Sequence, residues 1–159
     1  MYSELWQLTR TKEEANRLLG EAEALEAGLF RTNPEAWEEV MKTKVRLKVA
    51  QVLNQRLPQD AEGRQKVLRE LKKELVELPV ARLTLAVEPT EKMVQEISDK
   101  LRKEVAAGII VDIERDALIV GGALVTYGGK FGDFSLATRM EKVWAKQAET
   151  LLRMAYGGN

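Results

Sequence analysis

The chain has 159 residues, of which 45% are hydrophobic and 31% charged, and this composition is typical of one folded domain or two small ones. Lysine plus arginine and aspartate plus glutamate each total 25, so net charge excludes a general attraction to nucleic acid or to an anionic membrane. Because the chain contains no cysteine and no histidine, disulfides, thiol nucleophiles, zinc fingers, serine–histidine triads and imidazole metal sites are excluded as well.

The N-terminal residues carry no basic segment followed by an apolar run, so they do not have the pattern of a secretory signal. No apolar stretch approaches the roughly 20 residues that a helix needs to cross a bilayer. We therefore expect a soluble intracellular protein that meets a membrane only through a larger complex.

The first predicted helix runs from Thr11 to Leu29, because apolar residues recur there at helical spacing and Thr11 with Glu14 forms a capping box. Acidic residues dominate over 10–39 and basic residues over 42–73. Such a split fits two helices with complementary faces, a basic face offered to an acidic partner, or solvated faces. The acidic residues of the first helix lack the spacing of a calcium site or a di-iron bundle, and we interpret them as a solvated face: Glu13, Glu14, Glu21, Glu23 and Glu26.

A second helix is predicted over residues 34–56, with Asn33 as its N-cap, and a third over residues 60–78. Pro58 separates these two helices, and Pro79 ends the third because the residue before a proline disfavours the helical conformation. The first part of the chain is therefore expected to be a helical module of about three to four helices.

Beyond Pro79 the pattern changes to a mixture of strands and helices, which places a domain boundary there and predicts two domains, residues 1–79 and 80–159. The predicted elements are a strand over 80–87, a helix from Thr90 to a C-cap at Gly108, strands over 109–113 and 119–127, a hairpin at Gly128 and Gly129, a return strand at 130–131, and a helix over 134–155. The predicted fold class is α+β, with a helical module followed by a small β-α-β-β-α domain.

The glycines and the polar residues after them allow a chemical or a structural interpretation. A phosphate-binding turn is disfavoured, because no serine or threonine follows Lys130 to hold magnesium and the turn leads into a strand. Asp133 and Ser135 precede an amphipathic helix, which suits the capping of backbone amides better than catalysis. Arg139 lies one turn along that helix and is expected to bind Asp133, Asp116 or a partner's carboxylate.

One pattern of residues is shared with a known family. It consists of Asp116, Leu118, Gly121, Gly122, Gly128, Lys130, Asp133, Ser135, Arg139 and Glu141. These residues fall without a gap in the register of Asp-Pro-Ser-Leu-Ile-Gly-Gly, Gly-Asp-Lys, Asp-Gly-Ser and Arg-Leu-Glu, so the chain resembles the delta subunit of F-type ATP synthases, also called the oligomycin-sensitivity-conferring protein. Residues 83–91 are similar to the segment that precedes the family's C-terminal domain, with the proline one residue late. The resemblance covers residues 80–155, whereas the family's helical module is a larger bundle than the first 79 residues can form.

The resemblance implies a stator subunit with no catalytic chemistry and no cofactor or metal, peripheral at the cytoplasmic face of the membrane. Its helical module would bind N-terminal helices of the alpha subunits in the catalytic head, and its C-terminal domain would bind the ends of the peripheral-stalk b subunits. The residues assigned to the head are Trp6, Leu18, Leu25 and Trp37. Those assigned to the stalk are Val125, Tyr127, Leu136, Arg139, Met140 and Trp144. Structural roles are assigned to Asp116, Gly121, Gly122, Gly128, Asp133 and Ser135.

Two alternatives stay open from the sequence. The E subunit of V-type ATPases and a related flagellar stator-like regulator end in a similar domain after a long helix. One unbroken helix over residues 34–78 would favour them, and Pro58 argues against it. A small phosphate- or nucleotide-using enzyme is the alternative from another class, disfavoured because histidine, cysteine, a phosphate-binding loop and convergent carboxylates are absent from the sequence.

Overall fold

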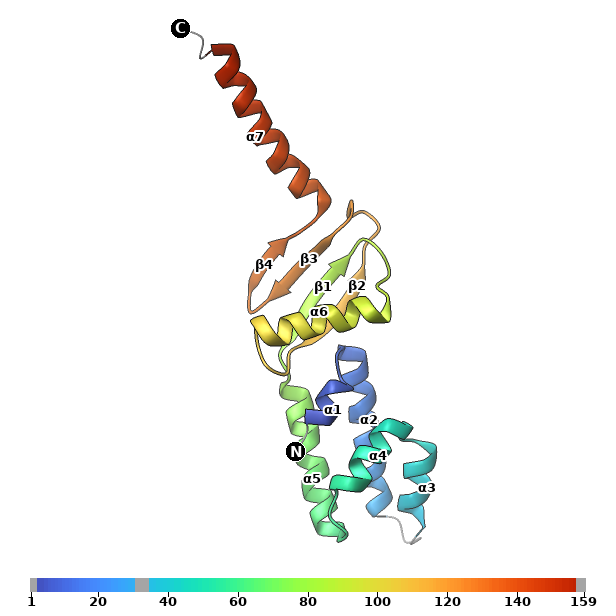
Figure 1. Cartoon of the computed structure of the whole chain (residues 1–159). Coiled ribbons are helices and arrows are strands. Elements are labelled where there is room, and N and C mark those ends of the chain that lie inside the picture. Colours follow the sequence, from blue (N-terminus) through green and yellow to red (C-terminus); the bar gives the residue numbers. More distant parts are fainter. Residues whose placement is uncertain (1–2, 31–34, 157–159) are drawn as a thin grey trace. The chain divides into compact units, whose positions relative to one another are not determined.

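The computed structural model describes residues 3–30 and 35–156, and in these residues it has seven helices and a four-stranded sheet (Figure 1). The chain forms two compact units. The first comprises the described residues up to Val80 together with Gln95–Val111, and the second comprises Ala81–Val94 and the residues from Asp112 onward. The helices come first and the strands follow, so the predicted α+β class is confirmed.

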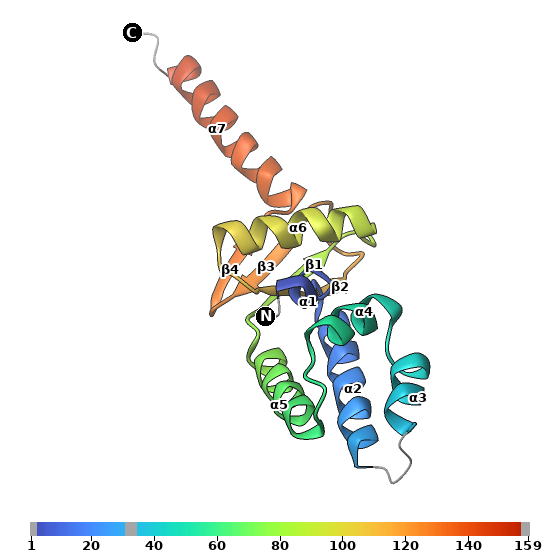
Figure 2. The ribbon, with the colours of Figure 1, turned by 60° about the horizontal axis from the view of Figure 1, so that its bottom comes forward.

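The first unit is built mainly from helices. Those before Pro79 are, in chain order, α1 (Ser3–Gln7), α2 (Lys12–Leu29), α3 (Ala36–Thr43), α4 (Leu47–Arg56) and α5 (Ala61–Glu77). Helix α2 packs beside both α3 and α5, which can be followed in the two views of Figures 1 and 2. These are five helices within the described residues, more than the three to four expected.

Local capping fixes where two of these helices begin. The Thr11 hydroxyl accepts from the Glu14 N–H at 3.1 Å, and the Glu14 carboxylate accepts in return from the N–H of Thr11. Asp60 likewise accepts from the Gly63 N–H at 2.6 Å at the start of α5. Each bond satisfies an amide that has no partner inside the helix, and the predicted starts of both helices are confirmed.

The single helix predicted over residues 34–56 is wrong, because the structure has two helices there with a break at residues 44–46. The break is caused by Glu21 of α2, whose side chain is only 5% exposed. Its carboxylate accepts from the Arg46 backbone N–H at 3.1 Å, from Nε at 2.7 Å and from Nη2 at 3.2 Å. In an unbroken helix the Arg46 N–H would bond the carbonyl of residue 42 instead. The expected N-cap at Asn33 and helix start at Pro34 lie outside the described residues.

The interpretation of the α2 acids as a solvated face is also wrong for two of them. Glu21 binds Arg46, and Glu26 binds both Arg69 and Lys72 of α5. The hydrogen bond from Lys72, and then the one from Arg69, hold the pKa of Glu26 below its ordinary value despite the opposing effect of partial burial. The acidic and basic stretches therefore meet as complementary faces, one of the three arrangements that the charge pattern allowed.

The core of the first unit extends beyond its helices. Ile110 packs with the buried leucines of α2 and α5. The Val111 N–H donates to the Arg10 carbonyl at 2.9 Å, and Arg102 donates to the Thr9 carbonyl. Residues 95–111 are thus tied to the helices by backbone and side-chain bonds, and the compact units do not follow one cut at Pro79. The boundary of the folding domains stays a prediction.

The sheet and the remaining helices follow Pro79. They are β1 (Val80–Leu85), α6 (Glu91–Glu104), β2 (Ile110–Arg115), β3 (Ala123–Tyr127), β4 (Lys130–Asp133) and α7 (Leu136–Tyr156), with strand order β2-β1-β3-β4. Strand β3 is antiparallel to β1 and to β4, and the register pairs Leu83 with Val125 and Val125 with Gly132. Directly paired residues share a face of a sheet, so these three lie on one side.

Among the element boundaries that differ from the predicted ones, two involve glycines. Helix α6 ends at Glu104, and Gly108, expected to be its C-cap, has a φ of +78° in the turn before β2. The strand predicted over 119–127 begins only at Ala123. The cause is that Gly121 and Gly122 both have positive φ, which an extended strand does not accommodate.

Replacing Glu21 with alanine should destabilise the first unit strongly, because the Arg46 guanidinium would lose its carboxylate in a mostly buried position. We expect a loss of roughly 3 kcal/mol in the free energy of unfolding, measured by urea denaturation. Glu13→Ala is the matched control, since Glu13 makes an exposed pair with Arg17 and should cost at most about 0.5 kcal/mol. Equal losses in the two variants would contradict the role given to Glu21.

Candidate partner-binding surfaces

The hairpin between β3 and β4 is closed by two glycines in the left-handed region. Gly128 and Gly129 have φ angles of +56° and +74°, and Tyr127 pairs with Lys130 across the turn. A two-residue turn with positive φ at both central positions matches the twist of the strands that it joins. The glycines therefore have the hairpin geometry expected from the sequence.

The second glycine pair makes room for the start of α7. Gly122 has a φ of +85°, and a Cβ placed on it would lie 2.3 Å from the carbonyl oxygen of Phe134. Beside it, the Leu136 N–H donates to the Gly121 carbonyl at 3.0 Å. The loop before β3 and the first residue of α7 are in direct backbone contact, which only a residue without a side chain permits.

Two polar side chains cap α7. Ser135 Oγ accepts from the Thr138 N–H at 3.3 Å, and Asp133 accepts from the Ser135 N–H at 2.8 Å and the Thr138 hydroxyl at 2.7 Å. The Ser135 N–H, and then the Thr138 hydroxyl, hold the pKa of Asp133 below its ordinary value. Asp133 and Ser135 thus have capping geometry, as expected.

Asp116 has the structural role expected of it, whereas Arg139 does not make the bond expected within the chain. Asp116 accepts from the Leu118 N–H at 2.9 Å, while its own N–H donates to the Leu85 carbonyl, so it fixes the turn after β2. Within the described residues, Arg139 makes no hydrogen bond or ion pair with Asp133 or Asp116. The intramolecular tie expected of Arg139 is therefore wrong, and a partner's carboxylate remains as the prediction.

Helix α7 carries a stripe of exposed apolar side chains. Leu136, Met140, Val143 and Trp144 recur at helical spacing, and their exposed fractions range from 47% to 65%. We call these four residues the α7 stripe. A contiguous apolar helix face left in water marks an interaction site. The sequence predicted three of its members and missed Val143.

The sheet adds half-buried residues to this unit. Val125 and Tyr127 alternate with Thr126 along β3, so both lie on the face that also carries Leu83. The sequence missed four exposed apolar residues near the glycine loop and β4: Leu118, Val120, Phe131 and Phe134. Their apolar character was visible, but their exposure depends on the irregular path of the loop.

The four residues assigned to the catalytic head differ in how deeply they are buried. Leu18 and Leu25 are 1% and 0% exposed in the core of the helices, so their assignment to a partner surface is wrong for this conformation. Trp6 is half-buried and lines a depression with Leu78 and Pro79. Leu18 and Leu25 lie on the one face of α2 that packs against its neighbours, and periodicity alone cannot tell such a face from a docking face.

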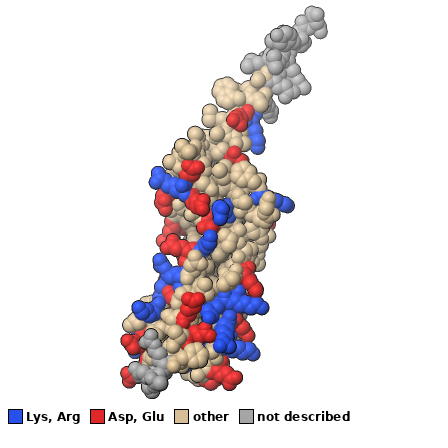
Figure 3. Space-filling view, turned by 180° about the vertical axis from the view of Figure 1, so that it is seen from behind, with Lys and Arg blue, Asp and Glu red and all other residues tan. Residues whose placement is uncertain are grey.

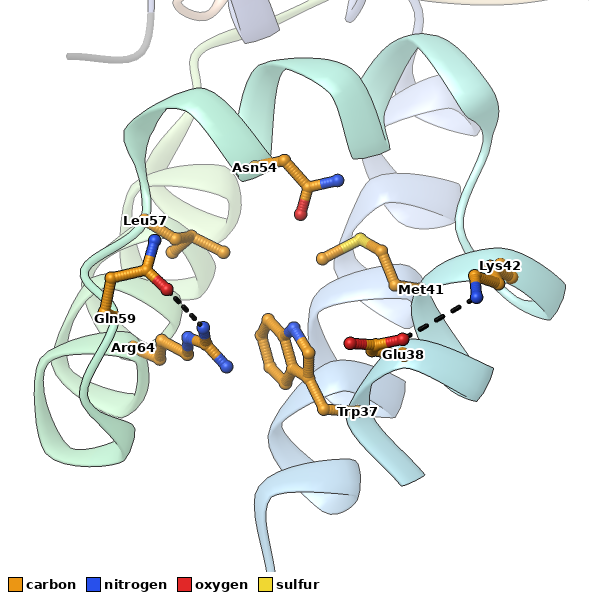
Figure 4. A pocket seen from close by; sticks show the side chains of 8 residues that line it. All are labelled: Trp37, Glu38, Met41, Lys42, Asn54, Leu57, Gln59 and Arg64. Atoms are coloured by element: carbon orange, nitrogen blue, oxygen red, sulfur yellow. Dashed lines mark hydrogen bonds and ion pairs between the residues drawn. The ribbon is translucent and has the colours of Figure 1, made fainter. Parts of the chain in front are cut away.

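Trp37 is half-buried and lines a pocket of about 360 Å³ between α3, α4 and the start of α5 (Figure 4). The guanidinium carbon of Arg64 lies 4.7 Å from the centre of its indole ring, within the range of a cation–π contact. The sequence did not single out Arg64, because its contact with Trp37 joins residues of different helices.

In the part of the chain that the structure describes, no helix is both long enough and apolar enough to span a bilayer, and no cluster of acidic residues could hold a metal ion. Seen from behind in Figure 3, basic and acidic side chains crowd together over the helical unit, while uncharged surface covers much of the sheet. The exposed features suit contact with other proteins.

Comparison with known proteins gives the family. A family model described as ATP synthase delta (OSCP) subunit matches residues 39–146, from α3 into α7. The chain belongs to the ATP synthase delta (OSCP) subunit family. The match begins well before residue 80, so membership of the delta family rests on helices of the first unit as well as on the glycine motif. The resemblance predicted from the sequence is confirmed.

A relative in this family is ATP synthase subunit delta of Syntrophobacter fumaroxidans, which is 32% identical over 77 residues. The match covers 48% of this chain and 40% of the relative. The chain thus matches less than half of the length of that delta subunit.

The V-type and flagellar alternatives would be favoured by one unbroken helix over residues 34–78. The structure has three helices there instead, α3, α4 and α5.

Replacing Gly122 with alanine should destabilise the protein, because the new Cβ would meet the Phe134 carbonyl and require an unfavourable positive φ. The conformational penalty alone is about 1–2 kcal/mol. Gly20→Ala is the matched control, since Gly20 lies inside α2 with open space around it and should gain up to about 1 kcal/mol. Thermal denaturation measures both, and a stabilising Gly122→Ala would contradict the close approach.

Asp133→Asn should lower the melting temperature at neutral pH and leave it unchanged in acid. A carboxylate with a lowered pKa stabilises the folded state above its unfolded value, roughly 3.9, and loses that contribution as the pH falls through its folded value. The difference between wild type and variant should therefore be present at pH 7, begin to shrink as the pH falls below the unfolded value of about 3.9, and be lost once the pH has fallen through the folded pKa. Glu141→Gln, an exposed charge change on the same helix, is the control, and an equal pH-dependent difference in that variant would contradict the assignment.

Proposed function

We propose that this protein is a non-catalytic stator subunit of an F-type ATP synthase, which joins the catalytic head to the peripheral stalk. Membership of the delta (OSCP) subunit family supports this role. The observation that carries it is the α7 stripe, the exposed apolar face of a helix whose first turn is capped by Ser135.

A stator must resist torque, so its contacts need large buried areas and slow dissociation. Burying one leucine, methionine or valine side chain fully contributes roughly 1.5–3 kcal/mol. The α7 stripe offers three such side chains and Trp144, and an amphipathic helix laid along α7 would cover them together. We assign this surface, with Val125, Tyr127 and Arg139, to the ends of the peripheral-stalk b subunits.

The first unit is proposed to bind N-terminal helices of the alpha subunits. Its candidate contacts are now Trp6 and Trp37, each half-buried beside a surface depression. Partly exposed tryptophans of this kind are frequent anchors of protein interfaces.

In this role the protein would lie at the cytoplasmic face of the membrane, held there by its complex, and would have no cofactor and no reaction of its own. Isothermal titration calorimetry with ATP and magnesium tests whether the protein lacks a reaction of its own. Binding heat that fits a micromolar dissociation constant would support an enzyme instead.

The test of the stator role is co-purification of the tagged full chain from its native membrane. We expect alpha and b subunits of the ATP synthase to be recovered with the wild-type protein. Met140→Glu places a charge in the α7 stripe, and because burying an unpaired charge is costly, recovery of b should fall on the order of tenfold or more.

Ala145→Glu is the matched control, because residue 145 lies on the opposite face of α7 and is also exposed. It should recover b as well as the wild type does. Wild-type protein without alpha or b subunits, or Met140→Glu protein with undiminished b, would each contradict the proposal.

A further inference from the structure

The pocket beside Trp37 has a mixed lining, in which apolar side chains stand beside a larger number of polar ones, and we call the polar side chains its rim. It is lined by Trp37, Glu38, Met41, Lys42, Asn54, Leu57, Gln59 and Arg64, which come from α3, α4, the following turn and α5 (Figure 4). Its volume of about 360 Å³ is at the small end for ligand sites. Space of this size accepts one or two side chains of a partner, and not a whole helix.

The apolar part of the lining suits an apolar side chain. Met41 is buried in the core of the helices, and Leu57 packs against that core from its edge. Figure 4 shows the side chains of Met41, Leu57 and Asn54 gathered around the indole of Trp37. A methylene or methyl group entering here would leave water and contact these side chains.

The rim suits an anion. Arg64 is held in place by a hydrogen bond from its Nε to the Pro58 carbonyl at 2.9 Å and by a longer one from Nη2 to Gln59 Oε1 at 3.4 Å. Stacking on Trp37 further fixes its plane. A guanidinium held this way loses little additional freedom when it binds a carboxylate.

Several donors around the pocket have no partner among the described residues. They are Arg64 Nη1, the indole N–H of Trp37 and the side-chain amide of Asn54. The one carboxylate on the rim, Glu38, is paired with Lys42 at 3.6 Å. With that pair neutralised, Arg64 leaves the lining with a net positive charge.

We propose that this pocket binds an acidic side chain of a partner helix, with an apolar side chain of the same helix seated one turn away. The carboxylate accepts from Arg64 and from the neighbouring donors, and the apolar side chain contacts Met41 and Leu57. A free inorganic anion would use only the rim and leave the side chains of Met41 and Leu57 uncovered. The proposed function enters this inference at one point, because it names the alpha subunit as the protein that supplies the partner helix. The preference for an acidic and an apolar side chain follows from the lining of the pocket alone.

The test uses the full chain labelled with ¹⁵N and two helical peptides of about 16 residues in an alanine-based host. One peptide carries leucine and glutamate four positions apart, and the other carries glutamine in place of that glutamate. Titration is followed at the indole N–H signal of Trp37, one of three tryptophans, assigned with Trp37→Phe. We expect the glutamate peptide to shift this signal and the glutamine peptide to bind roughly tenfold more weakly, because a hydrogen bond to a charged group is lost.

Arg64→Gln should reduce the affinity for the glutamate peptide to that for the glutamine peptide. Arg17→Gln, the same charge change at an exposed arginine of α2 outside the pocket, should leave both affinities unchanged. The indole signals of Trp6 and Trp144 report whether Arg64→Gln stays folded. If it does not fold, the comparison of the two peptides on wild-type protein decides the question alone.

Equal affinities for the two peptides, no shift of the Trp37 signal, or an equal shift with inorganic phosphate alone would overturn the inference. These outcomes are separate from co-purification of the complex. Peptide binding without recovery of ATP synthase subunits would refute the stator role and leave the pocket's specificity standing, and the reverse result would do the opposite.

Discussion

The buried carboxylate of Glu21 organises the first unit. A carboxylate that leaves water needs partners for its oxygens, and here the backbone N–H and guanidinium of Arg46 supply them. Because that N–H is withdrawn from a helical ladder, α3 and α4 are separate helices that can lie at an angle. The pocket lined by Trp37 and Arg64 lies between these helices and α5, so one ion pair determines both the path of the chain and the surface that it presents.

In the second unit the corresponding constraint is the absence of side chains at the glycine loop. Gly122 lets the Phe134 carbonyl approach its backbone, and Gly121 accepts from the first N–H of α7. Asp133 and Ser135 then satisfy amides at the helix start. Together these contacts fix the point at which α7 leaves the sheet. Because the start of α7 is anchored in this way, less conformational entropy is lost when a partner binds the α7 stripe than if the stripe lay on an unanchored segment.

The two units differ in the kind of surface that they offer. The second presents the α7 stripe, broad and apolar, which suits a long-lived contact with another helix. The first presents a small pocket lined by hydrogen-bond donors beside apolar side chains, which suits recognition of particular side chains. A protein that links two larger assemblies under load, the role that we propose for this one, benefits from both kinds of surface.

What the sequence by itself determined were features held together by neighbours in the chain. The capping box of Thr11 and Glu14, the hairpin at Gly128 and Gly129 and the cap at Ser135 each involve residues within a few positions of one another, so local patterns sufficed. Only the tertiary structure decided the break before α4, because Arg46 meets a residue 25 positions away. It also decided that Leu18 is core and Trp144 surface, since both lie on apolar helix faces and only packing partners distant in sequence determine which face is covered.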